Sequence, residues 1–200
     1  KIPIMKYNLS EITEIIRQRR SITPEQFAPR KVHREQLEVV LNNALWAPSH
    51  GMTQPWRFKV FTEGGLTRLQ QFVPELYRKT TAAEKFNQAK FDRMSLRLEK
   101  TTVVVALCME RDPTGKIDEI EEIEAVACAA QNMMLTCTAY GLGAFWSTPK
   151  FLSHPDMLGF LNLKESDRCL GLFYIGYPAG DWPVSHRKPL EYVAEWITTA

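Results

Sequence analysis

The chain has 200 residues, of which 44% are hydrophobic and 24% are charged, and its formal net charge is +2. These values predict one globular domain over residues 1–200 and exclude a disordered chain. Basic and acidic residues are interspersed, so neither nucleic acid nor a membrane surface is expected as a partner.

The elements of the first half follow from hydrophobic spacing. Ser10 is a candidate N-cap for the first helix, and Pro48 stops the second. Residues 78–98 are expected to line the entrance of a pocket, with Phe86 and Phe91 facing it. In chain order the elements are a helix from Ser10 to Arg20, a helix from about Glu35 to Trp46, a strand from Phe58 to Phe61 and a charged, helix-like region from Leu66 to Leu98.

The second half contains the longest predicted helix, which is apolar almost all round and is therefore expected to be buried on two sides. Gly141 is well placed as its C-terminal cap. The elements are a strand from Thr102 to Met109, the helix from Glu119 to Tyr140, a strand from Gly143 to Ser147, a helix from Pro155 to Leu161, a strand from Cys169 to Tyr177 and a final segment, Tyr192 to Ile197, that could extend as an arm. Together they favour a layered α+β or α/β fold.

The start of the chain and its cysteines indicate the cellular location of the protein. No apolar run approaches the roughly 20 residues that cross a bilayer, and no signal peptide is evident, so a cytoplasmic location is expected. Met5 is a candidate natural start, in which case residues 1–4 are foreign. No metal site is expected, and four cysteines are interpreted as buried, reduced thiols: Cys108, Cys128, Cys137 and Cys169.

Two basic clusters could hold an anion. Arg19, Arg20 and Ser21 combine two guanidiniums and a hydroxyl, which suits a phosphate or a carboxylate. Arginines in a last helical turn also satisfy the helix dipole without any ligand, and by itself that interpretation is favoured. Arg187 and Lys188 form a second cluster, which in isolation is usually a solvated turn.

The loop from Trp46 to Trp56 is the third candidate. Its prolines should hold Ala47 and Gln54 extended, and Gly51 allows a close approach of the backbone. Tryptophans and polar groups such as His50 would suit a planar heterocycle, although a rigid surface turn is the alternative. The later Gly141-Leu142-Gly143 lacks the spacing of a dinucleotide-binding fingerprint.

In combination these motifs resemble the nitroreductase family. The landmarks occur in the family's order and span nearly the whole chain. They are Arg19-Arg20-Ser21, Ala47-Pro48-Ser49 with Gln54-Pro55-Trp56, Gly141-Leu142-Gly143, Gly176-Tyr177-Pro178 and Arg187-Lys188-Pro189.

The resemblance implies a cofactor and a set of contacts. The cofactor is FMN, with NAD(P)H as the electron donor. Arg19, Arg20 and Ser21, joined by Arg187 or Lys188, would hold its phosphate and ribityl chain, and the other implied contacts are Trp46, His50, Gln54, Trp146, Ser147 and Thr148. No side chain is named as a catalytic acid or base, because the flavin carries the chemistry.

The resemblance also implies an architecture and an activity. The expected fold is a three-layer α/β/α sandwich around a mostly antiparallel sheet, completed by the partner's C-terminal arm in an intertwined homodimer. The expected activity is ping-pong reduction of a small electron-poor acceptor, such as a nitroaromatic or a quinone, with hydride from NAD(P)H. Two alternatives are a flavin- or small-ligand-binding protein with little turnover and a structural dimerisation module.

Overall fold

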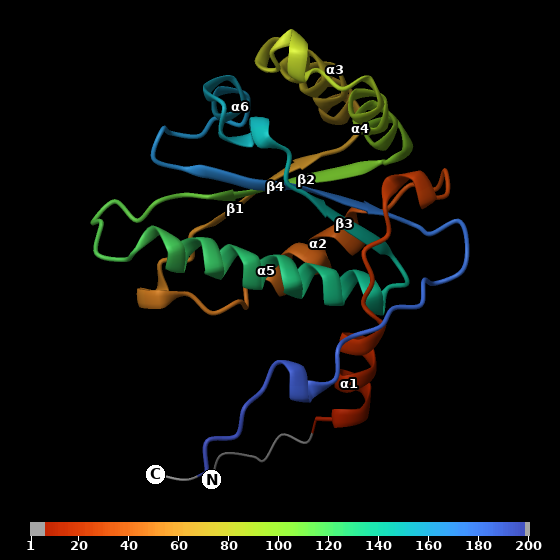
Figure 1. Cartoon of the computed structure of the whole chain (residues 1–200), viewed down its shortest axis with the longest axis vertical. Coiled ribbons are helices and arrows are strands. Elements are labelled where there is room, and N and C mark those ends of the chain that lie inside the picture. Colours follow the sequence, from red (N-terminus) through yellow and green to blue (C-terminus); the bar gives the residue numbers. More distant parts are fainter. Residues whose placement is uncertain (1–6, 199–200) are drawn as a thin grey trace.

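The computed structural model describes residues 7–198, so the expectations for residues 1–4 and Met5 lie outside the described residues. Figure 1 shows how the elements are arranged. The helices are α1 (Leu9–Gln18), α2 (Arg34–Ala44), α3 (Glu63–Thr80), α4 (Gln88–Lys100), α5 (Glu119–Ala139) and α6 (Pro155–Phe160), and the strands are β1 (Trp56–Phe61), β2 (Val103–Met109), β3 (Gly143–Ser147) and β4 (Arg168–Gly176).

The strands form an antiparallel sheet in the order β1-β2-β4-β3. The central strand β2 is buried along its whole length, as its run of β-branched residues predicts. It pairs with β4, so that Val105 lies opposite Phe173. Strands β1 and β3 are the edges. The α+β class and the mostly antiparallel sheet are therefore confirmed.

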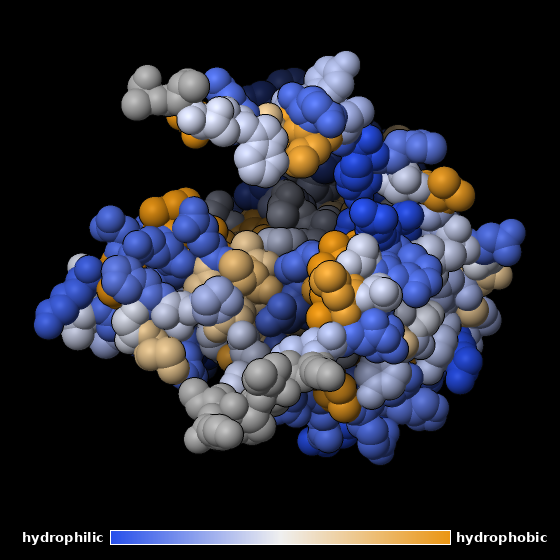
Figure 2. All heavy atoms as spheres, turned by 90° about the horizontal axis from the view of Figure 1, so that it is seen from below, coloured by the Kyte–Doolittle hydropathy of each residue, from blue (hydrophilic) through white to orange (hydrophobic). Residues whose placement is uncertain are grey.

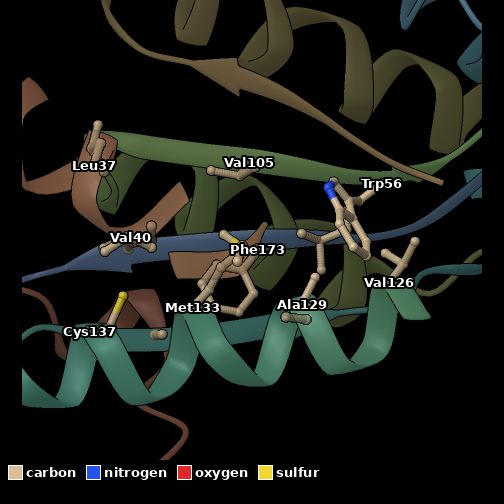
Figure 3. Packing of buried hydrophobic residues seen from close by; sticks show 14 of the residues in the cluster. Leu37, Val40, Trp56, Val105, Val126, Ala129, Met133, Cys137 and Phe173 are labelled. Carbon is tan, nitrogen blue, oxygen red and sulfur yellow. The ribbon is translucent and has the colours of Figure 1, made fainter. Parts of the chain in front are cut away.

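Helices cover both faces of this sheet. The α2 and α5 helices lie on one face, and α3, α4 and α6 lie on the other (Figure 1). Met133 of α5 points toward Phe173 of the sheet, and Cys137 of α5 points toward Val40 of α2 (Figure 3). Burial of a large apolar side chain such as Phe173 stabilises the fold by about 1.5–3 kcal/mol. The three-layer sandwich is therefore confirmed.

Several helix ends differ from the expectation, and one of them is the end of α1 at Gln18, before the two arginines. The N-cap of α1 is Asn8, whose side-chain oxygen accepts the backbone N–H of Ser10 at 3.1 Å. An asparagine caps as well as a serine, so the N-cap lies two residues before the expected one. The α2 helix ends at Ala44, and tighter turns carry the chain on to Trp46. Gly141 follows α5 with φ +68°, as its predicted capping role requires.

The α5 helix is buried against the sheet and along α2, where Asn43 of α2 donates to Thr136 at 3.0 Å. The two-sided burial predicted for this helix is therefore confirmed, but a third side is open in the single chain. Ile120 is 58% exposed there. We call this side the outer stripe of α5, and its exposed residues are Ile120, Glu124, Cys128, Gln131 and Ala139, with Leu135 partly exposed.

The cysteines do not all share the burial that was expected. Cys108, Cys137 and Cys169 are buried, and burial raises the pKa of Cys137 to about 12. Cys108 lies opposite Cys169 in the sheet, and a hydrogen bond to Cys169 together with burial raises the pKa of Cys108. Cys128 is exposed on the outer stripe, so the prediction of burial was wrong for it, because an apolar helix does not have to bury every side in one chain.

The two ends of the described chain project from the α5 side of the body (Figure 1). The α1 helix buries none of its residues. Near the C-terminus, Tyr192 is 74% exposed and Trp196 is 81% exposed. Figure 2, which looks from below Figure 1, shows a hollow with apolar residues around it on this side. In residues 7–198, no helix is long and apolar enough to cross a membrane.

Candidate functional site

A basic cluster lies where α1 meets the edge of the sheet. Ser21 forms an isolated parallel bridge with Ala144 of β3, which fixes the chain just after the two arginines. Arg20 donates from Nε to the carbonyl of Pro183 at 2.7 Å, and Arg19 donates from Nη1 to the sulfur of Met134 at 3.7 Å. These contacts attach the N-terminal arginines to both α5 and the C-terminal segment.

Arg187 joins the same cluster from the C-terminal segment. It lines a cavity of about 450 Å³ with Arg20, and the other lining residues are Ile16, Arg17 and Ser185. Burial lowers the pKa of Arg19, and the positive charges of Arg187 and Arg20 lower it further. Within residues 7–198, none of these three guanidiniums has a carboxylate partner in an ion pair. Arg19, Ser21 and the exposed Lys188 do not line this cavity.

The second part of the site lies along β3. Trp146, Ser147 and Thr148 line a cavity of about 440 Å³ between β3 and α4, which we call the inner cavity. The indole of Trp146 donates to the carbonyl of Leu170 at 3.0 Å and lies against Gly171, where an added Cβ would be 1.8 Å from the indole nitrogen. Gly171 is thus needed for the position of Trp146 beside the cavity.

The loop that contains Trp46, His50 and Gln54 begins next to Asn43, whose carbonyl accepts from Asn132 of α5, and runs to His50 at the start of that helix. Trp46 is 87% exposed, and His50 Nδ1 lies 2.8 Å from Glu121 Oε2 at the start of α5. Gln54 has φ +46°, so the prediction that Pro55 holds it extended was wrong. The Ser49 hydroxyl accepts the backbone N–H of Gln54 at 3.3 Å and supports this left-handed turn.

The structure therefore places the predicted residues in three groups: the arginines, the residues of β3 and the loop. The arginine group contacts α5 at Met134, and His50 of the loop contacts it at Glu121. At about 1.5 Å of rise per residue, these positions are about 20 Å apart along the helix axis. His50 and the arginine group are therefore held against opposite ends of α5.

Several functional candidates on α4 were not named individually from the sequence. Members of residues 78–98 line cavities, as predicted, and most of these members are polar or charged. Phe86 and Phe91 were expected to face the entrance; they are instead partly buried against the core beside Tyr77, at ring separations of 5.3 and 6.2 Å from it. Apolar rings gain more from mutual burial than from lining a wet entrance. The residues of α4 that line the inner cavity are Lys90, Arg93, Met94 and Arg97.

Glu25 was also missed, because a single carboxylate in a loop carries no motif. Its Oε1 accepts from Arg97 Nε at 2.7 Å, and its Oε2 is buried without a hydrogen-bond partner. The Arg97 guanidinium lies 4.7 Å above the centre of the Phe145 ring. This pair fixes Arg97 in the wall of the inner cavity.

Comparison with known proteins identifies related chains. Residues 16–177 match the model of the nitroreductase family. A nitroreductase-like family protein from Bacillus cereus has 26% identity and a TM-score of 0.80, with 98% of this chain and 100% of that chain covered. The FMN-dependent nitroreductase NfnB from Mycobacterium smegmatis, solved in complex with NADPH, has 19% identity and a TM-score of 0.73, with 94% and 99% covered. The nitrobenzene nitroreductase of Ectopseudomonas oleovorans is 24% identical, with 94% of this chain and 96% of that protein covered.

Proposed function

The chain belongs to the nitroreductase family, and from that premise we propose that it is a homodimeric oxidoreductase with a ping-pong mechanism. It is an FMN-dependent enzyme for which NAD(P)H is the electron donor. In the proposed cycle NAD(P)H and the acceptor occupy the same place in turn. The acceptor is a small electron-poor molecule such as a nitroaromatic or a quinone.

The observation that carries this proposal is the group of three arginines without carboxylates. Arg19, Arg20 and Arg187 repel one another, and a phosphate dianion among them would relieve that repulsion with charge-assisted hydrogen bonds. The exposed Ser21 hydroxyl beside them can bond to the phosphate or to the ribityl chain. Lys188, although outside the cavity, adds to the positive field at this position.

The edge of β3 offers a place for the flavin ring. Trp146, Ser147 and Thr148 line the inner cavity, and Ser21 connects this edge to the arginines through its bridge with Ala144. Side chains and backbone here can orient the ring and exclude water from one side of it. When bound, FMN supplies the two-electron chemistry between donor and acceptor, and for that reason no side chain is assigned as catalytic acid or base.

A homodimer would complete each site with the loop of the other chain. His50 contacts the opposite end of α5 from the arginines of its own chain, whereas in this dimer the loop of a partner would reach across the outer stripe of α5. The exposed apolar residues on this side support such an interface. They include Leu9, Ile12 and Ile16 of α1 as well as Trp46, Met52, Ile120, Val184, Leu190, Tyr192, Val193, Trp196 and Ile197.

In the same dimer the arm from Tyr192 to Ile197 would cross to the partner's sheet. Strand β1 is an open edge, and a cavity of about 590 Å³ runs beside it between Val60 and α2. An added strand would pair the free backbone groups of this edge. The proposal also includes a cytoplasmic location, which the free thiols of Cys108, Cys137 and Cys169 support because reduced cysteines suit a reducing compartment.

The test is the visible absorption spectrum of the purified protein after addition of FMN and desalting, followed under anaerobic conditions with NADH or NADPH. A retained flavin band that bleaches supports the enzyme, and a nitroaromatic or a quinone should then restore the band. A retained band that does not bleach would indicate a flavin-binding protein with little turnover. Loss of all flavin on desalting would contradict the assignment of the site.

A further inference from the structure

We propose that a cationic cleft between α4 and the segment after β3 binds the anionic group of a substrate whose reacting part lies at the inner cavity. This inference rests on the proposed function and goes beyond it, because it selects a chemical class of substrate. The group is a carboxylate or a phosphate. It can belong to the acceptor or to the donor, where it would be the phosphate that distinguishes NADPH from NADH.

The cleft consists of two adjoining cavities. The inner cavity reaches the residues of β3 that we assign to the flavin. A second cavity of about 610 Å³, the outer cavity, shares Lys90, Lys150 and Phe151 with it. The rest of the outer cavity is lined by Tyr77, Thr80, Thr81, Ala82, Lys85, Asn87, Ser153, His154 and Pro155. A substrate over the ring can therefore extend from the inner cavity into the outer one.

The charges along this path have one sign. Five cations line the two cavities, whereas their lining residues include no carboxylate. In residues 7–198, only Arg97 of the five has a carboxylate partner, which is Glu25. The five are Lys85, Lys90, Arg93, Arg97 and Lys150. A cleft with charges of one sign between protein walls raises the local concentration of ligands with the opposite charge.

The fold adds to this field and gives the ligand an apolar wall. The α4 helix begins at the outer cavity with Asn87 as its N-cap, and its first turn has no acidic residue to offset the positive end of its dipole. The rings of Phe145 and Tyr174 line the inner cavity. An aromatic acceptor with an acidic substituent matches this combination of flat apolar surface and positive charge.

Lys90 and Lys150 give the sharpest test because they line both cavities and are exposed. The test variant is Lys90→Gln with Lys150→Gln. The control, Lys100→Gln with Lys116→Gln, removes the same net charge from exposed positions that line neither cavity. The acceptor pair is the anion 4-nitrobenzoate and the neutral 4-nitrobenzamide, and the donor pair is NADPH and NADH. For each pair we would measure kcat/KM, and for 4-nitrobenzoate and 4-nitrobenzamide also the Kd by calorimetry.

We expect the test variant to lose about tenfold in kcat/KM for the anionic member of one pair, with the neutral or less charged member little changed. A selective loss for 4-nitrobenzoate assigns the cleft to the acceptor, and its Kd should rise in parallel. A selective loss for NADPH assigns the cleft to the donor. Added salt should reduce the wild-type preference in either case.

An equal loss for both members of each pair, or no loss, would overturn the proposal, as would the same loss in the control. Failure of the proposed function has a different signature. The flavin would then be absent or would not bleach with either donor, while calorimetry with 4-nitrobenzoate would still measure whether the cleft prefers an anion.

Discussion

The two ends of α5 differ in charge and in backbone shape. At the C-terminal end the helix meets Arg19 and the edge of β3, so that this end offers positive charge beside a regular strand. At the N-terminal end it meets His50 on a loop in which Gly51, Met52 and Gln54 all have positive φ, and which exposes Trp46. Neither end combines all the contacts expected for FMN. In the proposed dimer, one rigid helix thus sets the spacing of two half-sites that the second chain would bring together.

Removing charge from the arginine end should have the largest effect. We expect Arg19→Gln with Arg20→Gln to weaken FMN binding by about 100-fold, because each lost charge-assisted hydrogen bond to phosphate costs more than a neutral one. Fluorescence titration of the flavin would measure the Kd. The double variant Lys100→Gln with Lys116→Gln is the control for net charge and should bind normally. A Kd within about threefold of wild type would place the phosphate elsewhere.

Separating the two chains of the proposed dimer should weaken FMN binding, because each site would lose the loop of its partner. Leu135→Arg puts a charge on the outer stripe of α5, which we expect to shift the protein to monomers, since a buried unpaired charge is costly. Size-exclusion chromatography would measure the shift, and FMN retention should fall with it. Cys128 should then become reactive to a thiol reagent, with the buried Cys137 as internal control. A dimer that survives the change would place the interface on another surface.

Coexpression of a variant of the arginine group with a variant of the loop should restore part of the activity. A chain with Arg19→Gln and Arg20→Gln, coexpressed with a chain altered at Trp46→Ala and His50→Ala, gives heterodimers with one unaltered site. With random pairing we expect about one quarter of the wild-type rate, although each variant alone is nearly inactive. Steady-state assays of the mixture measure this. Activity no higher than that of the better single variant would mean that each chain builds its site alone.

The smallest effect concerns Glu25, which supports the charged wall near the arginine end. Burial raises the pKa of Glu25, but hydrogen bonds from its own backbone N–H, Thr23 and Arg97 outweigh burial and hold the pKa below its ordinary value of 4.5. The stability from this group is therefore present above pH 4.5 and is lost as the pH falls through the lower, folded-state pKa.

We expect Glu25→Gln to lower the free energy of unfolding by about 0.5 kcal/mol at neutral pH, because the pair is partly exposed. The difference should vanish in acid. Urea unfolding at several pH values would measure it, with exposed Glu84→Gln as the control. A difference that persists in acid would point to lost packing rather than lost charge.

Much of the fold could be predicted because its signals are local. A run of β-branched residues predicted β2, Gly141 predicted the end of α5, and apolar spacing predicted the helices. The pairing of β2 with β4 could not be predicted, because strands that are apolar on both sides fit many registers equally well. The opposition of Cys108 and Cys169 is a consequence of that register.

The site divides in the same way. Arg19, Arg20 and Ser21 are adjacent in sequence, so their common role was visible, and the family resemblance supplied Arg187. That Lys90 and Lys150 line the same two cavities could not be predicted, because it depends on how α4 packs over the end of β3. The conformation of Gln54 was missed because the rule for residues before proline is a local tendency, which a hydrogen bond from the Gln54 N–H to Ser49 and tertiary packing can override.

The order of the sheet also has a consequence for how the chain emerges during synthesis. Its central pair joins β2 (Val103–Met109) to β4 (Arg168–Gly176), so the middle of the sheet closes only after α5, β3 and α6 have been made. Until then the nascent chain has only the β1–β2 pair, and the free edge of a wholly apolar strand stays open to wrong partners. A ribosome that pauses between residues 109 and 168 would prolong that exposure.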